Sequence, residues 1–353
     1  MKNLIKKYLL WELKILARYL IKRDKPKIVA ITGSIGKTST KEAIYTLLSK
    51  KFPSRVAATP GNLNSEYGLP LAILGFKKQP WLFGWLWVLA VSWFKIFFVK
   101  LPQYLILEMA ADKPGDIDYL TGIVKPDIAV ITSIGPTHLE QFKTIENVAR
   151  EKIKLVEALP ENGIAVLNED DPYLKERLGS IKNKKIVFSA KPLEIATRGA
   201  IAVGRAFNIL THEAEEILKF FEMPEGRLNV LPGIFGSTLI NDSYNANPLS
   251  MKAALEKLSA MSGERKIAFL GDMLELGPES QKFHFEIANF ARKNSDLFVA
   301  VGPQFKQTNP ERWFATAEEA TAWLLKEIKE NDIILIKASH DTGLYKIVDD
   351  LRK

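Results

Sequence analysis

A glycine-rich segment near the start of the 353-residue chain carries residue types that bind phosphate. An apolar run, 28–32, leads into Gly-Ser-Ile-Gly-Lys-Thr-Ser, and a helix-forming stretch follows. Backbone N–H groups of such a loop attract anions, Lys37 would reach the outer phosphates, and the Thr38 hydroxyl would ligate Mg²⁺. Position 31, where the longer G-x-x-x-x-G-K-[ST] motif has its first glycine, is Ile, so the segment matches the shorter T-G-x-x-G-K-T form. We predict a nucleotide site that includes Gly33, Ser34, Gly36, Lys37, Thr38 and Ser39.

Short β-rich runs alternate with helical stretches after residue 26, a pattern typical of a mostly parallel sheet with helices on both faces. The first series has expected strands at 27–32, 104–108, 128–134, 164–168 and 185–189, with helices at 38–50, 145–158 and 171–179. The second has expected strands at 238–242, 266–271, 297–301 and 333–337, with helices at 248–260, 279–293 and 317–329. Turn-forming Pro and Gly residues join the two series within 222–236.

The fold class expected from this alternation is α/β. With the glycine loop in the first series, we expect a P-loop-type central ATPase domain, and we expect the second series to form a smaller Rossmann-like C-terminal domain. We expect an N-terminal helix over 1–26, a central ATP-binding domain over 27–226 and a C-terminal domain over 227–353. The central domain would carry an apolar, Trp-rich insertion at 81–101.

Composition excludes several classes of site and partner. Cysteine is absent, which excludes disulfides, thiol nucleophiles and Cys-ligated zinc. A multi-His metal site would need nearly all of the four histidines, His138, His212, His284 and His340. The net charge of +8 includes +6 from residues 1–25, which leaves +2 for the rest of the chain, so we expect no nucleic-acid partner.

Residues 1–25 mix apolar residues at roughly helical spacing with eight Lys or Arg and two acids. Because the charges recur throughout and no small-residue cleavage site follows, the segment does not resemble a secretory signal. One interpretation is a basic amphipathic helix that lies on an anionic membrane. The other is a helix that packs on the body of the protein and keeps its lysines in water.

The run 81–102 holds four Trp, four Phe and only two charged residues, Lys95 and Lys100. It approaches the length that spans a bilayer, about 20 apolar residues. The flanking segments 28–78 and 103–134 are both expected to serve one nucleotide site, so a single crossing would separate them. Trp enrichment favours the bilayer interface, and a buried helix or an oligomer contact is the alternative. We expect a cytoplasmic protein, peripheral on the inner face of the cell membrane, with contact through 1–25 and 81–101.

Several further segments, in this order along the chain, resemble the Mur ligases, which build the peptide stem of peptidoglycan. They are Thr-Pro-Gly-Asn-Leu-Asn at 59–64, Leu-Glu-Met at 107–109, Thr-His-Leu-Glu at 137–140, Arg-Glu-Lys at 150–152 and Asn168. Leu-Ile-Asn-Asp-Ser-Tyr-Asn-Ala-Asn-Pro at 239–248 and Leu-Gly-Asp-Met-Leu-Glu-Leu-Gly at 270–277 are similar to the MurF branch, the UDP-N-acetylmuramoyl-tripeptide–D-alanyl-D-alanine ligases. The resemblance covers about 27–353.

The sequence departs from the family pattern at four places. Only about 26 residues precede the phosphate-loop strand, where the family has an N-terminal domain for the UDP end of its substrate, so we expect that domain to be lacking. Region 189–226 looks short, Ala110 stands where the family commonly has Gly, and Lys-Ala-Ser-His at 337–340 replaces Lys-Gly-Ser-Arg. We expect the ATP chemistry to carry over, whereas recognition of the nucleotide-sugar acceptor stays open.

The resemblance implies an ATP-dependent amide ligase of peptidoglycan precursor synthesis, which adds D-alanyl-D-alanine to a UDP-muramyl-tripeptide through an acyl phosphate. It implies ATP and two Mg²⁺ as cofactors. Lys37, Glu108, His138 and Lys152 would be catalytic, and Thr38, Glu108, His138 and Lys152 would serve the metal ions. Lys152 would be carbamylated by CO₂, which requires a neutral amine, and neighbouring Lys154 is the competing alignment.

Residues of the C-terminal half match the family's nucleotide and substrate motifs. Asp242, Asn245 and Asn247 would lie at the adenine and ribose, and Arg227 would contact ATP phosphates. The expected substrate residues are Asn62, Asn64, Asp272, Lys337 and Ser339. Each also has an alternative interpretation in turn or helix-cap chemistry. A nucleotide site built from two domains implies that the domains close during turnover.

Two other functions are alternatives to this one. A Mur-type ligase could act on a different acceptor, one that is membrane- or lipid-linked, because the UDP-binding domain is not evident and two segments favour membranes. A non-catalytic nucleotide-binding module is the second alternative. A soluble peptidoglycan precursor and an amino acid or dipeptide are the small-molecule partners expected of the first function.

Overall fold

A computed structural model describes residues 2–80 and 84–352 of the chain. The chain divides into two compact units, Met1–Ile134 with Glu146–Phe221 and Gly135–Ile145 with Glu222–Lys353. The first three residues of the Trp-rich run, 81–83, lie outside the described residues. The boundaries that we expected at 26 and 226 stay predictions.

The first unit is built on a six-stranded, wholly parallel sheet with the order β2-β3-β1-β4-β5-β6. Its strands are β1 (Lys27–Thr32), β2 (Val56–Ala58), β3 (Tyr104–Glu108), β4 (Ile128–Ile131), β5 (Ile164–Asn168) and β6 (Lys184–Phe188). The central strands are nearly continuous apolar runs, as expected for strands that helices cover on both faces. Because the strands are parallel, their carboxyl ends meet at one edge, where Ile31 of β1 pairs with Glu108 of β3.

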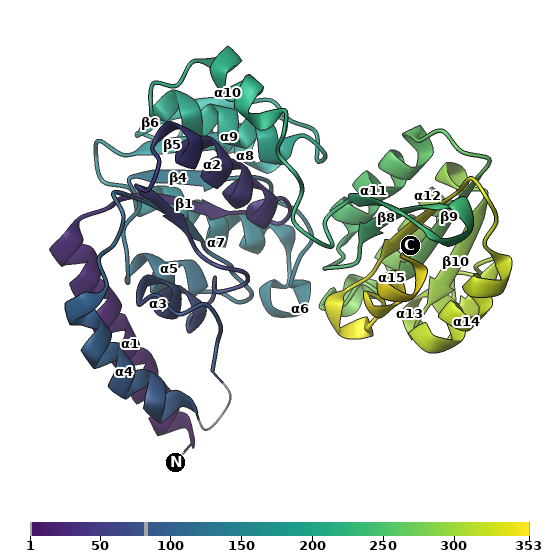
Figure 1. The fold of residues 1–353 in the computed structure, drawn as a ribbon, viewed down its shortest axis with the longest axis horizontal. Coiled ribbons are helices and arrows are strands. Elements are labelled where there is room, and N and C mark those ends of the chain that lie inside the picture. The colour runs from purple at the N-terminus through teal and green to yellow at the C-terminus, as the bar shows by residue number, and fades with distance from the viewer. Residues whose placement is uncertain (1, 81–83, 353) are drawn as a thin grey trace. The chain divides into compact units, whose positions relative to one another are not determined.

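Helices cover both faces of this sheet. They are α1 (Lys2–Asp24), α2 (Lys37–Lys51), α3 (Gly68–Ile73), α4 (Trp85–Phe98), α5 (Asp116–Thr121), α7 (Ile145–Glu157), α8 (Pro172–Arg177), α9 (Ile195–Ala206) and α10 (Thr211–Leu218). Figure 1 shows α2, α9 and α10 on one face and α3 and α5 on the opposite face. The close approach of α2 and α9 depends on Gly199, where a Cβ would lie 3.1 Å from Thr40 Cγ2.

The two unusual segments of the sequence, α1 and α4, lie side by side in the first unit (Figure 1). α1 buries Leu13, Leu16 and Leu20 almost completely and contacts α3 as well as α4. Residues 2–24 are thus helical, as the sequence predicts, and one face of the helix packs on the body. Within residues 2–80 and 84–352, none of the helices has both the length and the apolar character that crossing a bilayer requires.

The second unit holds another six-stranded sheet, in the order β11-β10-β9-β12-β8-β7, in which only β7 is antiparallel. Its strands are β7 (Asn229–Pro232), β8 (Thr238–Asp242), β9 (Arg265–Gly271), β10 (Leu297–Val301), β11 (Arg312–Phe314) and β12 (Asp332–Lys337). Its helices are α6 (Leu139–Phe142), α11 (Pro248–Ala260), α12 (Ser280–Asn294), α13 (Pro303–Lys306), α14 (Ala317–Glu327) and α15 (Lys346–Leu351). One apolar core joins α11 and α12 to the sheet, and a second joins α14 and α15.

The α/β fold class with two sheet-based parts is confirmed. The strand expected over 128–134 ends at Ile131, because the next two residues turn their hydrogen bonds toward the glycine loop. The expected helix at 171–179 covers Pro172–Arg177, with Asp171 as its N-cap. The sequence analysis missed β2, β7 and β11, which are short strands at or near the edges of the two sheets.

Candidate functional site

The glycine loop between β1 and α2 needs its glycines for steric reasons. Gly33 has a φ of 153°, and a Cβ at this position would lie 1.8 Å from Thr132 Oγ1. Gly36 has a φ of 79° and precedes the first residue of α2. A side chain is strained at such backbone angles, so the sequence forms this sharp turn only with glycine at both positions.

The two residues that follow β4 hold the loop in shape. Ser34 N donates to Ser133 O at 2.8 Å, and Ile35 N donates to Ser133 Oγ at 3.0 Å. The Thr132 hydroxyl donates to Ile35 O at 2.6 Å. With these amides engaged, the N–H groups at the start of the 15-residue helix α2 are the donors that an anion would meet.

Three polar side chains surround this helix start. Lys37 reaches back over the loop, and its Nζ donates to Gly33 O at 2.8 Å. Thr38 and Ser39 lie buried in the first turn of α2. The predicted phosphate-binding residues of the loop are therefore all at the carboxyl edge of β1, where ligands of parallel sheets bind.

Glu108 is the last residue of β3 and lies next to β1 at the same edge. Its side chain is 1% exposed. Asn64 Nδ2 donates to Oε1 at 2.9 Å, whereas Oε2 has no hydrogen-bond partner among the described residues. A buried carboxylate oxygen without a partner carries an energetic cost that a cation would relieve.

Lys41 is a residue that the sequence analysis missed. Its side chain is wholly buried, one helical turn beyond Lys37, and its Nζ donates to Thr59 O at 2.8 Å. The same Nζ lies 3.0 Å from Glu42 Oε1 and 3.9 Å from Glu108 Oε2. Lys41 thus connects the 59–61 turn to α2 through a hydrogen bond and places a positive charge near Oε2 of Glu108. The helical spacing from Lys37 was visible in the sequence, but nothing there indicated burial.

Lys152 and Lys154 of α7 differ sharply in environment. Lys152 is 1% exposed, and burial, followed by repulsion from the nearby Lys37 charge, lowers the pKa of its amine to about 7. Lys154 lies nearer the surface, and its Nζ is 2.6 Å from Asp118 Oδ2 and 2.8 Å from Glu151 Oε2. Burial acts to lower the pKa of Lys154, but these hydrogen bonds raise it on balance. Of the two lysines, only Lys152 combines burial with a lowered pKa.

These side chains fit a divalent cation that is shared with a phosphate ligand. Thr38 offers a hydroxyl and Glu108 offers its second carboxylate oxygen at one sheet edge. Within residues 2–80 and 84–352, no group of three or more His, Asp or Glu side chains could hold a metal by itself. Mg²⁺ characteristically binds one or two carboxylates and completes its shell with phosphate oxygens and water.

His138 belongs to the second unit, at the start of α6. Its φ is 52°, and its Nδ1 lies 2.7 Å from Glu275 Oε2. This hydrogen bond lowers the pKa of Glu275, so the carboxylate is charged and Nδ1 is the protonated nitrogen. The contact orients the His138 ring through Nδ1, as a carboxylate does for metal-ligating histidines. Glu275 is a second residue that the sequence analysis missed as a site residue.

The carboxyl edge of the second sheet is occupied by an ion pair. Asp242 ends β8 and Lys337 ends β12, and the two strands pair with each other in parallel. Lys337 Nζ is 2.5 Å from Asp242 Oδ2 and also donates to Asn245 O at 2.8 Å. Lys337 is 1% exposed. Its ammonium group contacts both Asp242 and the Asn245 carbonyl oxygen, and it thereby holds the 242–245 turn in place.

Asn245 and Asn247 both take part in turn chemistry. Asn245 Oδ1 accepts from Ala246 N at 2.8 Å. Asn247 is the N-cap of α11, and with Ser250 it forms a reciprocal capping box. The alternative interpretation of Asn247 as cap chemistry therefore describes its contacts in this unit.

Arg227 lies beside a series of neighbouring aromatic rings that the sequence did not reveal. Its guanidinium carbon is 4.2 Å from the centroid of the Tyr244 ring. Tyr244 neighbours His340, whose ring stacks on Tyr345 with a centroid separation of 4.7 Å. Planar groups of this kind offer faces on which another ring can stack.

Asp272 and Ser339 meet at the ends of β9 and β12. Both Asp272 carboxylate oxygens accept from backbone N–H groups at the start of α13, at 3.0 Å from Gln304 N and 3.2 Å from Phe305 N. The Ser339 hydroxyl accepts from Leu274 N at 2.9 Å. Among the expected substrate residues, Asn62 is exposed in the first unit. The side chains of the other four form hydrogen bonds with groups of the protein: Asn64, Asp272, Lys337 and Ser339.

Comparison with protein families accounts for both units. The Mur ligase middle domain matches residues 31–246, which is more than half of the chain. The Mur ligase glutamate ligase domain matches residues 226–340. The chain belongs to the Mur ligase family. This confirms the resemblance drawn from the sequence motifs.

Curated relatives of this Mur ligase include two proteins named UDP-N-acetylmuramoyl-tripeptide–D-alanyl-D-alanine ligase. The one from Bacillus subtilis (strain 168) is 29% identical, over 95% of this chain and 78% of its own length. The one from Escherichia coli (strain K12) is 26% identical, over 96% of this chain and 79% of its own length.

Solved structures show the same fold. The structure of MurF ligase from Thermotoga maritima in complex with ADP has a TM-score of 0.82 at 27% identity, and the match covers 96% of this chain and 82% of that one. A bifunctional folylpolyglutamate synthase/dihydrofolate synthase with Mn, AMPPNP and L-glutamate bound has a TM-score of 0.67 at 19% identity. That match covers 97% of this chain and 93% of that one.

Proposed function

We propose that this Mur ligase uses ATP to form an amide bond in peptidoglycan precursor synthesis, joining D-alanyl-D-alanine to a UDP-muramyl-tripeptide. The names of the relatives that match over most of both chains support the assignment. The observation that carries it is the grouping of the glycine loop and Glu108 at one sheet edge, with the Lys37 charge near the buried Lys152.

The proposed reaction has two steps. An oxygen of the tripeptide carboxylate attacks the γ-phosphorus of ATP, the bond to ADP breaks, and an acyl phosphate forms. The amine of D-alanyl-D-alanine then attacks the acyl carbon, inorganic phosphate leaves, and the nitrogen loses a proton. Lys37 and the first N–H groups of α2 would bind the phosphates, where they offset the charge that develops during transfer.

We infer that the cofactors are ATP and two Mg²⁺ ions, which would be served by Thr38, Glu108, His138 and Lys152. The metal supplies charge neutralisation between phosphate and carboxylate oxygens. The free Oε2 of Glu108 and the Nδ1 bond of His138 support their roles as ligands. We further propose that Lys152 is carbamylated, since a pKa of about 7 leaves much of its amine neutral at neutral pH.

The remaining site residues divide into two groups in this proposal. Arg227, Asp242, Asn245 and Asn247 would serve the nucleotide, and the stack of Arg227 on Tyr244 supports a ring-binding surface there. Asn62, Asn64, Asp272, Lys337 and Ser339 would serve the substrates. For Asn64, Asp272 and Lys337 the hydrogen bonds to the protein favour a positioning role over direct contact.

The proposal also covers location and domain organisation. We infer that the enzyme works in the cytoplasm, peripheral on the inner face of the cell membrane, with no nucleic-acid partner. The aromatic and cationic residues of 1–25 and 81–101 support the membrane contact. The proposed domains are 1–26, 27–226 and 227–353.

The experiment is a phosphate-release assay with purified chain, Mg²⁺ and ATP. We expect release only when UDP-muramyl-tripeptide and D-alanyl-D-alanine are both present, and mass spectrometry should detect the joined product. Lys37→Ala should abolish release while the fold is kept. Phosphate release that neither substrate stimulates would reject this assignment. Stimulation only by a lipid-linked acceptor would show that the acceptor is not the UDP-muramyl-tripeptide.

A further inference from the structure

α1 is apolar on two faces, and only one of them is covered. Leu9, Leu13, Leu16 and Leu20 form the face that packs on the body. Tyr8, Trp11, Ile15 and Tyr19 recur at the same helical spacing on another face and are between 41% and 59% exposed. A helix that needs only one apolar face for its packing has no structural reason to keep a second one in water.

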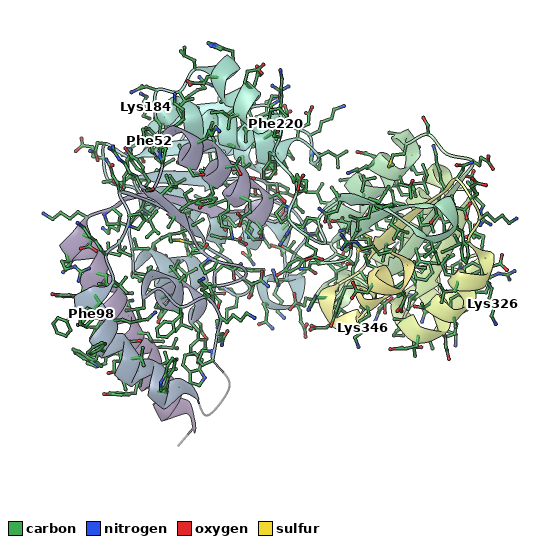
Figure 2. All side chains as sticks on the ribbon, in the orientation of Figure 1. Phe52, Phe98, Lys184, Phe220, Lys326 and Lys346 are labelled. Carbon is green, nitrogen blue, oxygen red and sulfur yellow. The ribbon has the colours of Figure 1, made fainter. Side chains whose placement is uncertain are left out.

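α4 repeats the pattern. Val88, Ser92 and Ile96 are buried at a spacing of four residues. Trp87, Phe94, Phe97 and Phe98 are between 64% and 73% exposed. Figure 2 shows the Phe98 side chain directed away from the body of the first unit. No other helix in the described part of the chain exposes so many aromatic side chains.

Specific contacts join the two helices into one structural element. Trp93 Nε1 donates to the buried Glu12 carboxylate, which binds the middle of α1 to α4. Arg23 donates to the carbonyl oxygens of Ile96 and Val99, where α4 ends. The two exposed stripes are therefore carried by one fixed pair of helices. We call these residues together the α1–α4 aromatic surface and define it by Tyr8, Trp11, Ile15, Tyr19, Trp87, Phe94, Phe97 and Phe98.

The exposed charged side chains of α1 and of residues 84–100 are all cations, within the residues whose burial is described. Lys7, Arg18, Lys22 and Lys100 are exposed near it. The two acids of residues 1–25 are both engaged, Glu12 with Trp93 and Asp24 with Arg23 and Leu101 N. The sequence has no acid between positions 81 and 100. Exposed aromatic rings beside an excess of cations match the interface of a bilayer that contains anionic lipids.

The topology places this surface away from the phosphate loop. α1 ends two residues before β1 begins, and α4 leads into β3, so both helices end near the amino ends of these strands. The glycine loop follows β1 and Glu108 ends β3, so the length of these strands, about 16–20 Å at 3.3 Å per residue, separates them from the ends of the two helices. A partner bound at the α1–α4 aromatic surface leaves the site edge of this unit uncovered.

We propose that the α1–α4 aromatic surface docks on the headgroup region of an anionic lipid bilayer, with its rings inserted and its cations against the phosphates. This inference deepens and rests on the membrane location proposed above, while ligase chemistry is measured separately. Charge complementarity favours lipid over a second copy of the chain, because two copies would bring the same cations together.

The test is flotation of the full chain with phosphatidylcholine vesicles that contain or lack phosphatidylglycerol. The triple variant Phe94→Ser, Phe97→Ser, Phe98→Ser removes three exposed rings and should weaken partitioning by at least about tenfold. Its control is Leu193→Ser, Leu210→Ser, Phe220→Ser, three exposed apolar residues elsewhere in the same unit, which should partition as the wild type does. Both variants should retain soluble phosphate release, so failure of docking is distinguishable from failure of the proposed ligase.

A charge variant tests the electrostatic part. Lys7→Gln, Arg18→Gln, Lys22→Gln should remove the preference for phosphatidylglycerol and flatten the dependence of binding on salt. Equal partitioning of the wild type and the Phe triple variant would overturn the proposal. So would a wild-type dimer, detected by sedimentation, that the Phe triple variant abolishes while neither protein floats with vesicles.

Discussion

Asn64 donates to one oxygen of the buried Glu108 carboxylate at 2.9 Å and leaves the other oxygen without a hydrogen-bond partner among the described residues. This hydrogen bond fixes the rotation of the Glu108 carboxylate and leaves Oε2 as its unbonded acceptor oxygen. Lys41, 3.9 Å from that oxygen, supplies charge but no hydrogen bond. In our proposal, a buried acid held in this way would bind its cation without rotation of the carboxylate.

Asn64→Ala should weaken Mg²⁺ binding, because Glu108 then loses the hydrogen bond that orients it. Loss of an orienting partner typically costs about 10–100-fold in metal affinity. The measurement is the Mg²⁺ concentration that gives half-maximal phosphate release. Asn183→Ala is the control, since the Asn183 amide lies in the same unit and donates to a carbonyl oxygen, Pro160 O at 2.8 Å, rather than to a carboxylate. Equal Mg²⁺ requirements in the two variants would show that Asn64 does not position Glu108.

Lys152→Met should stabilise the protein in CO₂-free buffer below pH 7. The folded-state pKa of Lys152 is about 7, against an ordinary value of 10.5, so below pH 7 the folded protein holds a buried charge. Between pH 7 and 10.5 the unfolded state binds more protons than the folded state, so the free energy of unfolding of the wild type rises with pH. The difference in stability between Lys152→Met and the wild type therefore shrinks over this range. Thermal unfolding across this pH range checks the sign. An advantage that grows with pH would contradict the low pKa.

The same Lys152→Met variant should lose ligase activity, because it has no amine to carbamylate. Lys154→Met is the control and should keep most of the activity, since Lys154 is paired with Asp118 and Glu151. The readout is phosphate release with and without added bicarbonate. Bicarbonate should stimulate the wild type and Lys154→Met but not Lys152→Met, a result that supports carbamylation of Lys152. Full activity of Lys152→Met would refute it.

Lys37 and Lys41 lie one turn apart on α2, and their substitution by Met should affect different properties, activity in one case and stability in the other. Lys37→Met should lower phosphate release about a thousandfold with little change in unfolding, because its amine serves the phosphates. Lys41→Met should lower the free energy of unfolding by about 3–5 kcal/mol, because it leaves buried Glu108 without its nearby cation. Chemical denaturation and phosphate release separate the two effects. Equal stability of both variants would contradict the structural role of Lys41.

Gly33→Ala should abolish nucleotide binding, because the new Cβ would overlap Thr132 Oγ1 and force the loop open. Gly115→Ala is the control, since Gly115 also has a positive φ, 92°, but has nothing within 4 Å of the added Cβ. Titration calorimetry with an ATP analogue should show binding by the control only. Wild-type affinity in Gly33→Ala would mean that the loop does not hold the phosphates.

Local patterns predicted much of the fold and the phosphate loop. β1 and the loop after it are consecutive in sequence, so Gly33, Lys37 and Thr38 could be assigned from spacing alone. The position of Glu108 could be predicted too, since a residue that ends an apolar parallel strand lies at the ligand-binding edge, whereas its proposed metal role came from the family resemblance.

Contacts between distant parts of the chain could not be predicted in this way. Lys41 looks like any helical lysine until the 59–61 turn folds over it. The contact of Lys337 with Asp242 could not be predicted, because it depends on the pairing of β12 with β8. The packing of α1 on α4 depends on Glu12 and Trp93, which are 81 residues apart. Family resemblance supplied roles for such residues, but not their partners.

Isotope transfer from the substrate carboxylate tests the central claim most directly. The tripeptide carboxylate is labelled with heavy oxygen, and the phosphate released during ligation is examined by mass spectrometry. Activation through an acyl phosphate predicts that each released phosphate carries one oxygen from the carboxylate. Product formation with unlabelled phosphate would contradict the acyl phosphate, and with it the account of how the Lys37 loop and Glu108 work together.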